Sequence, residues 1–125
     1  MKRLPDSELD VMIAIWKLGT KATRMDIESA LNKSSEWSAT TILSLLSRLE
    51  KKGFVKVEKN GKQNIYEALI SQESYLQEES KSVLEKMYNN SITNFMVALY
   101  SGKKPSKKQL NELQDLIDGF KEEEN

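Results

Sequence analysis

The chain of 125 residues contains no cysteine and no histidine. Without cysteine it can form neither a disulfide framework nor a thiolate nucleophile, and without histidine it lacks the commonest metal ligand and the usual general base. An enzyme would then need paired acids in a cleft, but the acidic runs at 78–79 and 122–124 are more simply solvated surface. We therefore expect no catalytic site, no metal and no cofactor.

Long apolar runs are also missing. No stretch approaches the roughly 20 residues that cross a bilayer, and the opening MKRLPDSELD lacks the apolar centre of a signal peptide. The expected location is the cytoplasm, without membrane insertion. The net charge is zero, but residues 1–70 hold 12 Lys and Arg against 9 Asp and Glu, whereas residues 71–125 hold 7 against 10. A basic front suits a half that faces nucleic acid.

Three short helices are predicted in the first 53 residues. Asp6 or Ser7 can cap the first, whose apolar residues recur with helical spacing until Gly19. Thr23 and Asp26 resemble a capping box that opens the second. Ser38 caps the third, and Gly53 stands where a left-handed residue ends it. Its apolar stripe is narrow and consists of Ile42, Leu45, Leu46 and Leu49.

A β-hairpin is predicted directly after the third helix. Val55 and Val57 alternate with polar residues, Asn60-Gly61 offers a type I′ turn, and Ile65 and Leu69 alternate with Tyr66 and Ala68 on the return. Three helices followed by a hairpin are typical of a winged helix. The expected fold is therefore mainly α, an α+β winged helix-turn-helix over residues 1–70 with an all-helical domain over residues 71–125.

The second domain shows helical patterns and no strand signal. Its three apolar stripes exceed what so few helices can bury against each other, which favours a symmetric homodimer. We expect the dimer interface to comprise Leu76, Val83, Met87, Ile92, Phe95, Met96, Leu99, Leu110, Leu113, Ile117 and Phe120.

The third helix carries the residues that point to function. The face opposite its apolar stripe is short, polar and basic, as a helix in the major groove requires. Arginine can bond a guanine edge and threonine methyl groups can touch thymine. Two lysines flank the hairpin tip, where a wing meets phosphates. The predicted contacts with double-stranded operator DNA are Trp37, Thr40, Thr41, Ser44, Arg48, Lys51, Lys59 and Lys62. Alternatively, Trp37 is a packing residue and the two wing lysines protect a sheet edge.

The run Trp37-Ser38-Ala39-Thr40-Thr41-Ile42, followed by Arg48-Leu49 and Lys51-Lys52-Gly53, resembles the penicillinase and methicillin-resistance repressors of the BlaI/MecI/CopY family. The resemblance implies a winged helix that binds inverted repeats upstream of β-lactam-resistance genes and a C-terminal domain that holds the dimer together. It also implies base contacts by Thr41, Ser44 and Arg48, with Trp37, Lys51 and the wing lysines on the backbone. Where the family often has proline, this chain has Ala39.

Members of the resistance type are inactivated when a protease linked to a membrane sensor brings about cleavage of an Asn-Phe bond. This chain has such a pair, Asn94-Phe95. The resemblance therefore implies cleavage there, although packing alone could place Phe95 on its apolar stripe. The copper-responsive branch senses metal through cysteines, which this chain lacks.

Two other functions remain open at this stage. A winged helix can serve as a protein-interaction module, which the near-neutral charge favours. A regulator can also respond to a small-molecule effector without being cleaved, because apolar pockets leave no sequence motif.

Overall fold

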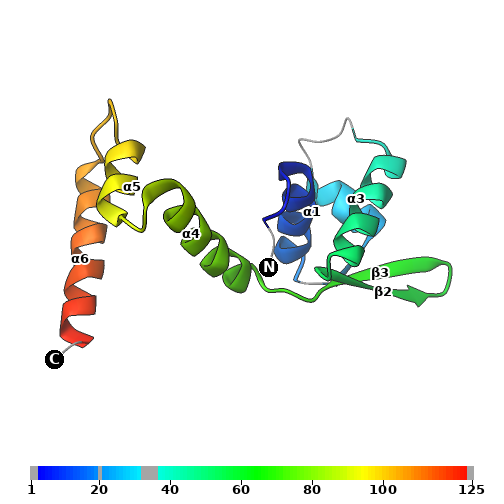
Figure 1. Cartoon of the computed structure of the whole chain (residues 1–125). Helices are drawn as coiled ribbons and strands as arrows, with labels where there is room; N and C mark the ends of the chain where they lie inside the picture. The colour runs from blue at the N-terminus through cyan, green and yellow to red at the C-terminus, as the bar shows by residue number, and fades with distance from the viewer. Residues whose placement is uncertain (1–2, 20, 32–36, 124–125) are drawn as a thin grey trace. The chain divides into compact units, whose positions relative to one another are not determined.

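The computed structural model describes residues 3–19, 21–31 and 37–123 (Figure 1). The chain is mainly helical and contains a small antiparallel sheet. It forms two compact units, Met1–Ser80 and Lys81–Asn125. The division predicted from the sequence lies at residue 70. The boundary between the compact units lies ten residues later, after the first two turns of the helix Gln72–Tyr88 that follows the hairpin.

The first three helices are α1 (Asp6–Lys17), α2 (Arg24–Leu31) and α3 (Ala39–Lys51). The expected cap at Asp6 or Ser7 is wrong, because Pro5 occupies the N-cap position and no side chain caps α1. Proline suits the start of a helix, where its missing N–H costs no hydrogen bond. The capping box of α2 is confirmed: the Asp26 N–H donates to Thr23 Oγ1 at 3.1 Å, and the Thr23 N–H donates to Asp26 Oδ2 at 3.1 Å.

The hairpin consists of β2 (Val55–Asn60) and β3 (Gln63–Ala68). The predicted Asn60-Gly61 turn lies one residue later, because Asn60 pairs with Gln63 and the two-residue turn is Gly61-Lys62. Gly61 has φ +67°, which fits a turn with glycine at its first central position. Tyr66 and Ala68 face β2 residues Val57 and Val55 in the register, and Tyr66 is buried while Leu69 is exposed.

A third strand, β1 (Lys21–Thr23), pairs antiparallel with β3 and makes the sheet order β1-β3-β2. No pattern in the sequence indicates this strand. It has only three residues, too few for an alternating pattern, and it depends on pairing with a segment more than 40 residues away, for example Ala22 with Tyr66.

The core of the N-terminal unit lies between α1, α2, α3 and the sheet, and its largest fully buried side chains include Met12, Ile27, Ile42 and Phe54. One core residue comes from beyond the hairpin. Tyr75, in the first turn of α4 (Gln72–Tyr88), is 2% exposed, packs edge-on against Phe54 with ring centroids 5.8 Å apart, and accepts a hydrogen bond from the Leu4 N–H at 2.9 Å.

The C-terminal unit contains the end of α4, α5 (Ile92–Leu99) and α6 (Lys107–Glu123). Asn89 and Asn90, both with positive φ, join α4 to α5, and the hydroxyls of Ser91 and Ser106 cap α5 and α6. No described residue of this unit is buried. Within the described parts of the chain, none of the helices combines the length and the apolar character that a membrane span needs.

Candidate nucleic-acid interface

The helix α3 presents one face to the core and the opposite face to solvent. Its entry is fixed by Ser38, whose Oγ accepts a hydrogen bond from the Thr41 N–H at 3.1 Å, as predicted. Its end is fixed by Gly53, which adopts φ +82°. The predicted stripe, Ile42, Leu45, Leu46 and Leu49, is buried. The orientation of α3 about its own axis therefore follows from the apolar pattern.

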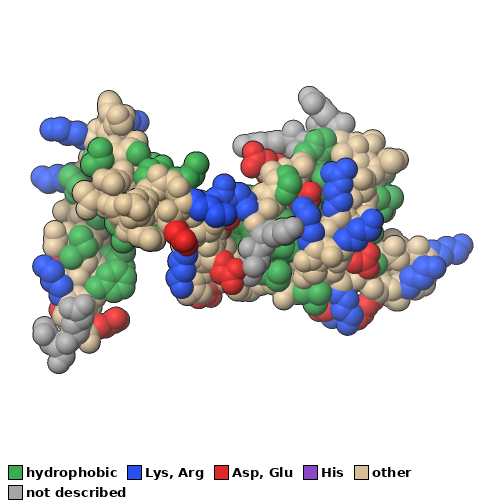
Figure 2. Space-filling view, in the orientation of Figure 1, with side chains coloured by type: hydrophobic (Ala, Val, Ile, Leu, Met, Phe, Trp, Pro, Cys, Tyr) green, Lys and Arg blue, Asp and Glu red, His purple; other side chains and the backbone are tan. Residues whose placement is uncertain are grey.

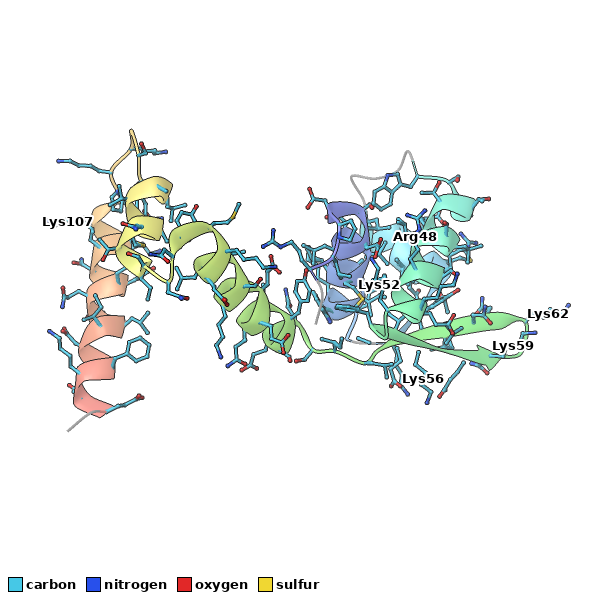
Figure 3. The ribbon with its side chains drawn as sticks, in the orientation of Figure 1. Arg48, Lys52, Lys56, Lys59, Lys62 and Lys107 are labelled. Carbon is cyan, nitrogen blue, oxygen red and sulfur yellow. The ribbon has the colours of Figure 1, made fainter. Side chains whose placement is uncertain are left out.

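The opposite face of α3 carries the side chains expected to read DNA. Thr40, Thr41, Ser44, Arg48 and Lys51 are all exposed, as is Ser47 between them. Figure 3 shows Arg48 standing on this helix. Neither Arg48 nor Lys51 forms an ion pair with another described residue, so both cations can bind bases or phosphates without first losing a carboxylate partner.

The hairpin adds two cations to this surface. Lys59 lies near the end of β2 and Lys62 in the turn, and Figure 3 shows both at the tip of the hairpin. Lys56, nearer the base, is different, because its Nζ lies 2.6 Å from Glu58 Oε1. The hydrogen bond and the charge of Glu58 raise the pKa of Lys56, and Lys56 in turn lowers the pKa of the Glu58 carboxyl. The wing therefore presents its unpaired charge at the tip.

Trp37 precedes the cap of α3, is half-buried and packs against the core. This arrangement favours the packing interpretation of Trp37. A contact between Trp37 and a DNA phosphate stays a prediction.

An ion pair that the sequence did not reveal fixes the far end of α3. Lys52, the C-cap residue, places its Nζ 2.5 Å from Oε1 of Glu8 in α1. The Glu8 side chain is 4% exposed and that of Lys52 is 34% exposed. A buried carboxylate needs a partner, so this pair ties the C-terminal end of the exposed helix to α1.

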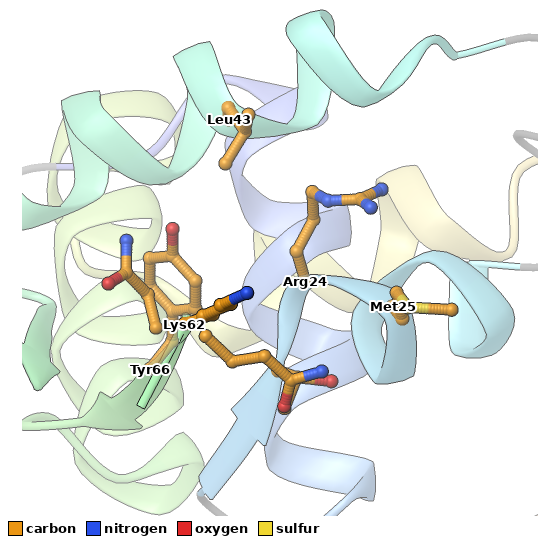
Figure 4. Close-up of a pocket in the computed structure, with 8 residues that line it drawn as sticks. Arg24, Met25, Leu43, Lys62 and Tyr66 are labelled. Carbon is orange, nitrogen blue, oxygen red and sulfur yellow. The ribbon is translucent and has the colours of Figure 1, made fainter. Parts of the chain in front are cut away.

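A shallow hollow lies between α2, α3 and the hairpin and has a volume of about 230 Å³ (Figure 4). Arg24, Met25, Leu43 and Lys62 are among the residues that line it, together with the largely buried Tyr66. Of these residues, only Lys62 is a DNA contact predicted from the sequence. Leu43 could have been found, because it lies one residue after Ile42 and is therefore rotated off the apolar stripe.

The residues predicted to form the dimer interface remain uncovered within the single chain. Four of them, Val83, Phe95, Met96 and Leu113, are half-buried, and the other seven are exposed, from 45% for Ile117 to 67% for Ile92. Hydrophobic side chains are visible over the C-terminal helices in Figure 2. Contiguous exposed apolar surface of this kind marks interaction sites in proteins, and the dimer interface stays a prediction.

The predicted cleavage bond, Asn94-Phe95, lies in the first turn of α5. Asn94 is exposed, and its N–H donates to Ser91 Oγ at 3.0 Å. Phe95 is half-buried and packs edge-on against Tyr88, with ring centroids 5.3 Å apart.

The comparisons with known proteins agree with this geometry. The family model described as penicillinase repressor matches residues 4–119. The chain is 32% identical over 124 residues to the penicillinase repressor of Bacillus licheniformis, covering 97% of this chain and 96% of the relative. It is 25% identical over 114 residues to the methicillin resistance regulatory protein MecI of Staphylococcus aureus strain N315, covering 91% and 92% of the two chains.

A solved structure shows the same fold in the N-terminal part. The DNA-binding domain of the repressor BlaI is 36% identical, covers 60% of this chain and 94% of its own, and superposes with a TM-score of 0.50. The winged helix expected from the sequence is thus confirmed. Taken with the exposed basic face of α3, these findings show that the chain belongs to the penicillinase repressor family and is a DNA-binding transcriptional repressor rather than an enzyme.

Proposed function

We propose that this repressor acts as a homodimer that binds an inverted-repeat operator and controls genes of β-lactam resistance. The observation that carries the proposal is that the chain has two exposed surfaces of different chemistry, a basic face on α3 and an apolar surface on the C-terminal helices. The basic face suits DNA phosphates and base edges, and the apolar surface suits another protein surface. The relatives named for penicillinase and methicillin resistance support the choice of target genes.

The second copy of the chain is the economical partner for the apolar surface. The stripe of α6, Leu110, Leu113, Ile117 and Phe120, repeats at three- and four-residue intervals over nearly the whole of a 17-residue helix. Such a stripe fits the same stripe on a symmetry-related helix, since a two-fold interface is made by one surface meeting itself. A two-fold dimer in turn presents two winged helices, which matches an operator of two inverted half-sites.

The roles on DNA follow from side-chain chemistry. Arg48 suits a guanine edge, and Thr41 and Ser44 lie on the same exposed face to contact bases. Thr40, Lys51 and the tip lysines Lys59 and Lys62 suit phosphates, which fix the register on the duplex. On this proposal the protein works in the cytoplasm, beside the DNA that it binds.

Release by proteolysis at Asn94-Phe95 is part of the same proposal. Proteases require an extended substrate, and the bond lies in a helix of only eight residues with none buried. Such a helix opens at little cost in free energy. Its cleavage by a protease linked to a membrane sensor would separate the winged helix from α6, and two unlinked half-site binders lose the advantage of joint binding.

The proposal is tested with the purified full-length chain. Duplexes are selected from a random pool by binding, sequenced, and titrated at several salt concentrations beside scrambled duplexes of equal composition. The expected result is an enriched inverted repeat, bound at two chains per duplex, with an affinity that falls steeply as salt rises. Enrichment of a single half-site bound by one chain would contradict the dimer, and no enrichment would contradict operator recognition.

A further inference from the structure

Leu43 is the one large apolar side chain that α3 exposes to solvent. It is 44% exposed, whereas Ile42, Leu45, Leu46 and Leu49 in the same helix are buried, at 4% exposure or less. The exposed side chains around it along the helix are hydroxylic or charged. Leu43 therefore interrupts a face of α3 whose other exposed side chains are polar.

The surroundings of Leu43 indicate what it faces. Leu43 lines the hollow shown in Figure 4, to which α2 contributes Arg24 and the hairpin contributes Lys62. Arg24 Nη1 is hydrogen-bonded to Glu28 at 2.6 Å, while Lys62 forms no ion pair with any residue that the structure describes. The polar side chains of Thr23, Gln63 and Asn64 also line the hollow, so it suits the edge of a polyanion better than a buried apolar effector.

Double-stranded DNA offers one apolar group to a helix in its major groove, the C5-methyl group of thymine. The other exposed groups of the base edges are hydrogen-bond donors and acceptors, with which a leucine cannot pair. We propose that Leu43 is a specificity-determining residue that reads a thymine methyl group in each half-site, while Lys62 holds a neighbouring phosphate. This inference rests on the proposed function, because it requires α3 to lie in the major groove of an operator.

A contact between Leu43 and a thymine methyl group can be distinguished from a hydrogen bond to the same base. Replacing one thymine by deoxyuridine removes a single methyl group and leaves every hydrogen-bonding atom of the base pair in place. If Leu43 buries that methyl group, each half-site should contain one thymine whose replacement lowers the affinity of the wild-type chain roughly fourfold. This factor corresponds to about 0.8 kcal/mol for one buried methyl-sized group. Other thymines contacted only through hydrogen bonds should tolerate the replacement.

The experiment is a double-mutant cycle on the operator selected with the full-length chain. Wild type and Leu43→Ala are titrated against duplexes in which each thymine in turn is replaced by deoxyuridine. Leu43→Ala should bind the unmodified operator more weakly and show no further loss at the position to which wild type responds. Leu43→Met, which keeps an apolar side chain of similar volume, should restore the response.

The matched control is Leu69→Ala, which truncates a leucine that is 56% exposed and follows β3, outside the proposed DNA surface. It should respond to deoxyuridine as wild type does. Equal losses in wild type and Leu43→Ala at every thymine would overturn the role of Leu43 and leave operator binding intact. Failure to select any operator would overturn both this inference and the proposed function.

Discussion

The carboxylate of Glu8 and the ammonium group of Lys52 lie 2.5 Å apart and join α1 to the C-terminal end of α3. Among the described residues, Glu8 is the only buried one that carries a charge, with 3% of the whole residue exposed. The pair is therefore more than a surface ion pair, because removal of one partner leaves the other charge without its match.

Lys52→Met should lower the free energy of unfolding by about 2 kcal/mol, because the buried carboxylate of Glu8 then has no partner. Water that reaches the position of Lys52 should relieve part of this desolvation penalty. The Glu8→Leu/Lys52→Met double variant should recover much of this loss, because neither charge then remains. Urea unfolding of both variants measures the difference. A double variant no more stable than Lys52→Met alone would show that the pair matters through packing rather than charge.

Arg48→Ala should weaken specific binding by roughly 1 to 3 kcal/mol while the dimer survives, because a bidentate contact with guanine is lost and no core contact changes. Titration against the operator and a scrambled duplex measures this loss. Lys56→Ala is the matched control, since it removes a cation already paired with Glu58. Unchanged discrimination in Arg48→Ala would remove Arg48 from the residues that read bases.

The Lys59→Gln/Lys62→Gln variant should bind operator and scrambled duplexes more weakly by similar factors. Phosphate contacts carry no sequence information, and each contributes about −0.9 to the slope of log affinity against log salt. The slope should therefore fall in magnitude by roughly two for each protomer. An unchanged slope with normal affinity would assign the two lysines to protection of the hairpin edge.

Tyr75→Ala should lower the free energy of unfolding of the N-terminal unit by about 3 to 5 kcal/mol, as for other buried aromatic residues. Tyr75→Phe should cost about 1 kcal/mol, because the Leu4 N–H loses its acceptor while the ring remains. Thermal unfolding measures both, with Gln77→Ala on the exposed side of α4 as control. A fragment of residues 1–80 should be much more stable than one of residues 1–70, and equal stability would contradict the role of Tyr75.

Ser91→Ala should accelerate cleavage beside Phe95 by about fivefold, because losing a helix cap costs about 1 kcal/mol and so favours the open form of α5. Limited proteolysis with an enzyme that cuts beside aromatic residues measures the rate. Ser106→Ala removes the corresponding cap from α6 and should leave cleavage at Phe95 unchanged. Equal acceleration by both variants would indicate loosening of the whole unit instead of local opening.

The features of the fold that the sequence predicted are those encoded within a few residues. The Thr23-Asp26 box, the Ser38 cap and the left-handed Gly53 all involve groups within three or four positions of each other, and all are present. The hairpin was also predictable, but its turn was misplaced by one residue, because Gly61 can occupy either central position of a tight turn.

The features that escaped prediction depend on contacts between distant segments. Pairing with β3 makes a strand of only three residues, Glu8 meets Lys52 across 44 positions, and Tyr75 meets Leu4 across 71. None of these leaves a periodic pattern. The exposed face of α3 follows from its apolar stripe, and the position of Leu43 off that stripe is local as well. Polarity alone does not indicate Leu43 as a DNA contact, because its side chain forms no hydrogen bonds.

The place of Tyr75 in the core bears on how induction ends. The bond at Asn94-Phe95 lies well beyond it, so a cut chain keeps Tyr75 and with it an intact N-terminal unit. On the proposed mechanism the cut product loses the apolar stripe of α6 but keeps its folded DNA-binding unit, so it can still bind a half-site when it is abundant. Operator occupancy then depends on the ratio of fragments to full-length chains. That ratio returns to its starting value only after growth dilutes the fragments and new full-length chains replace them.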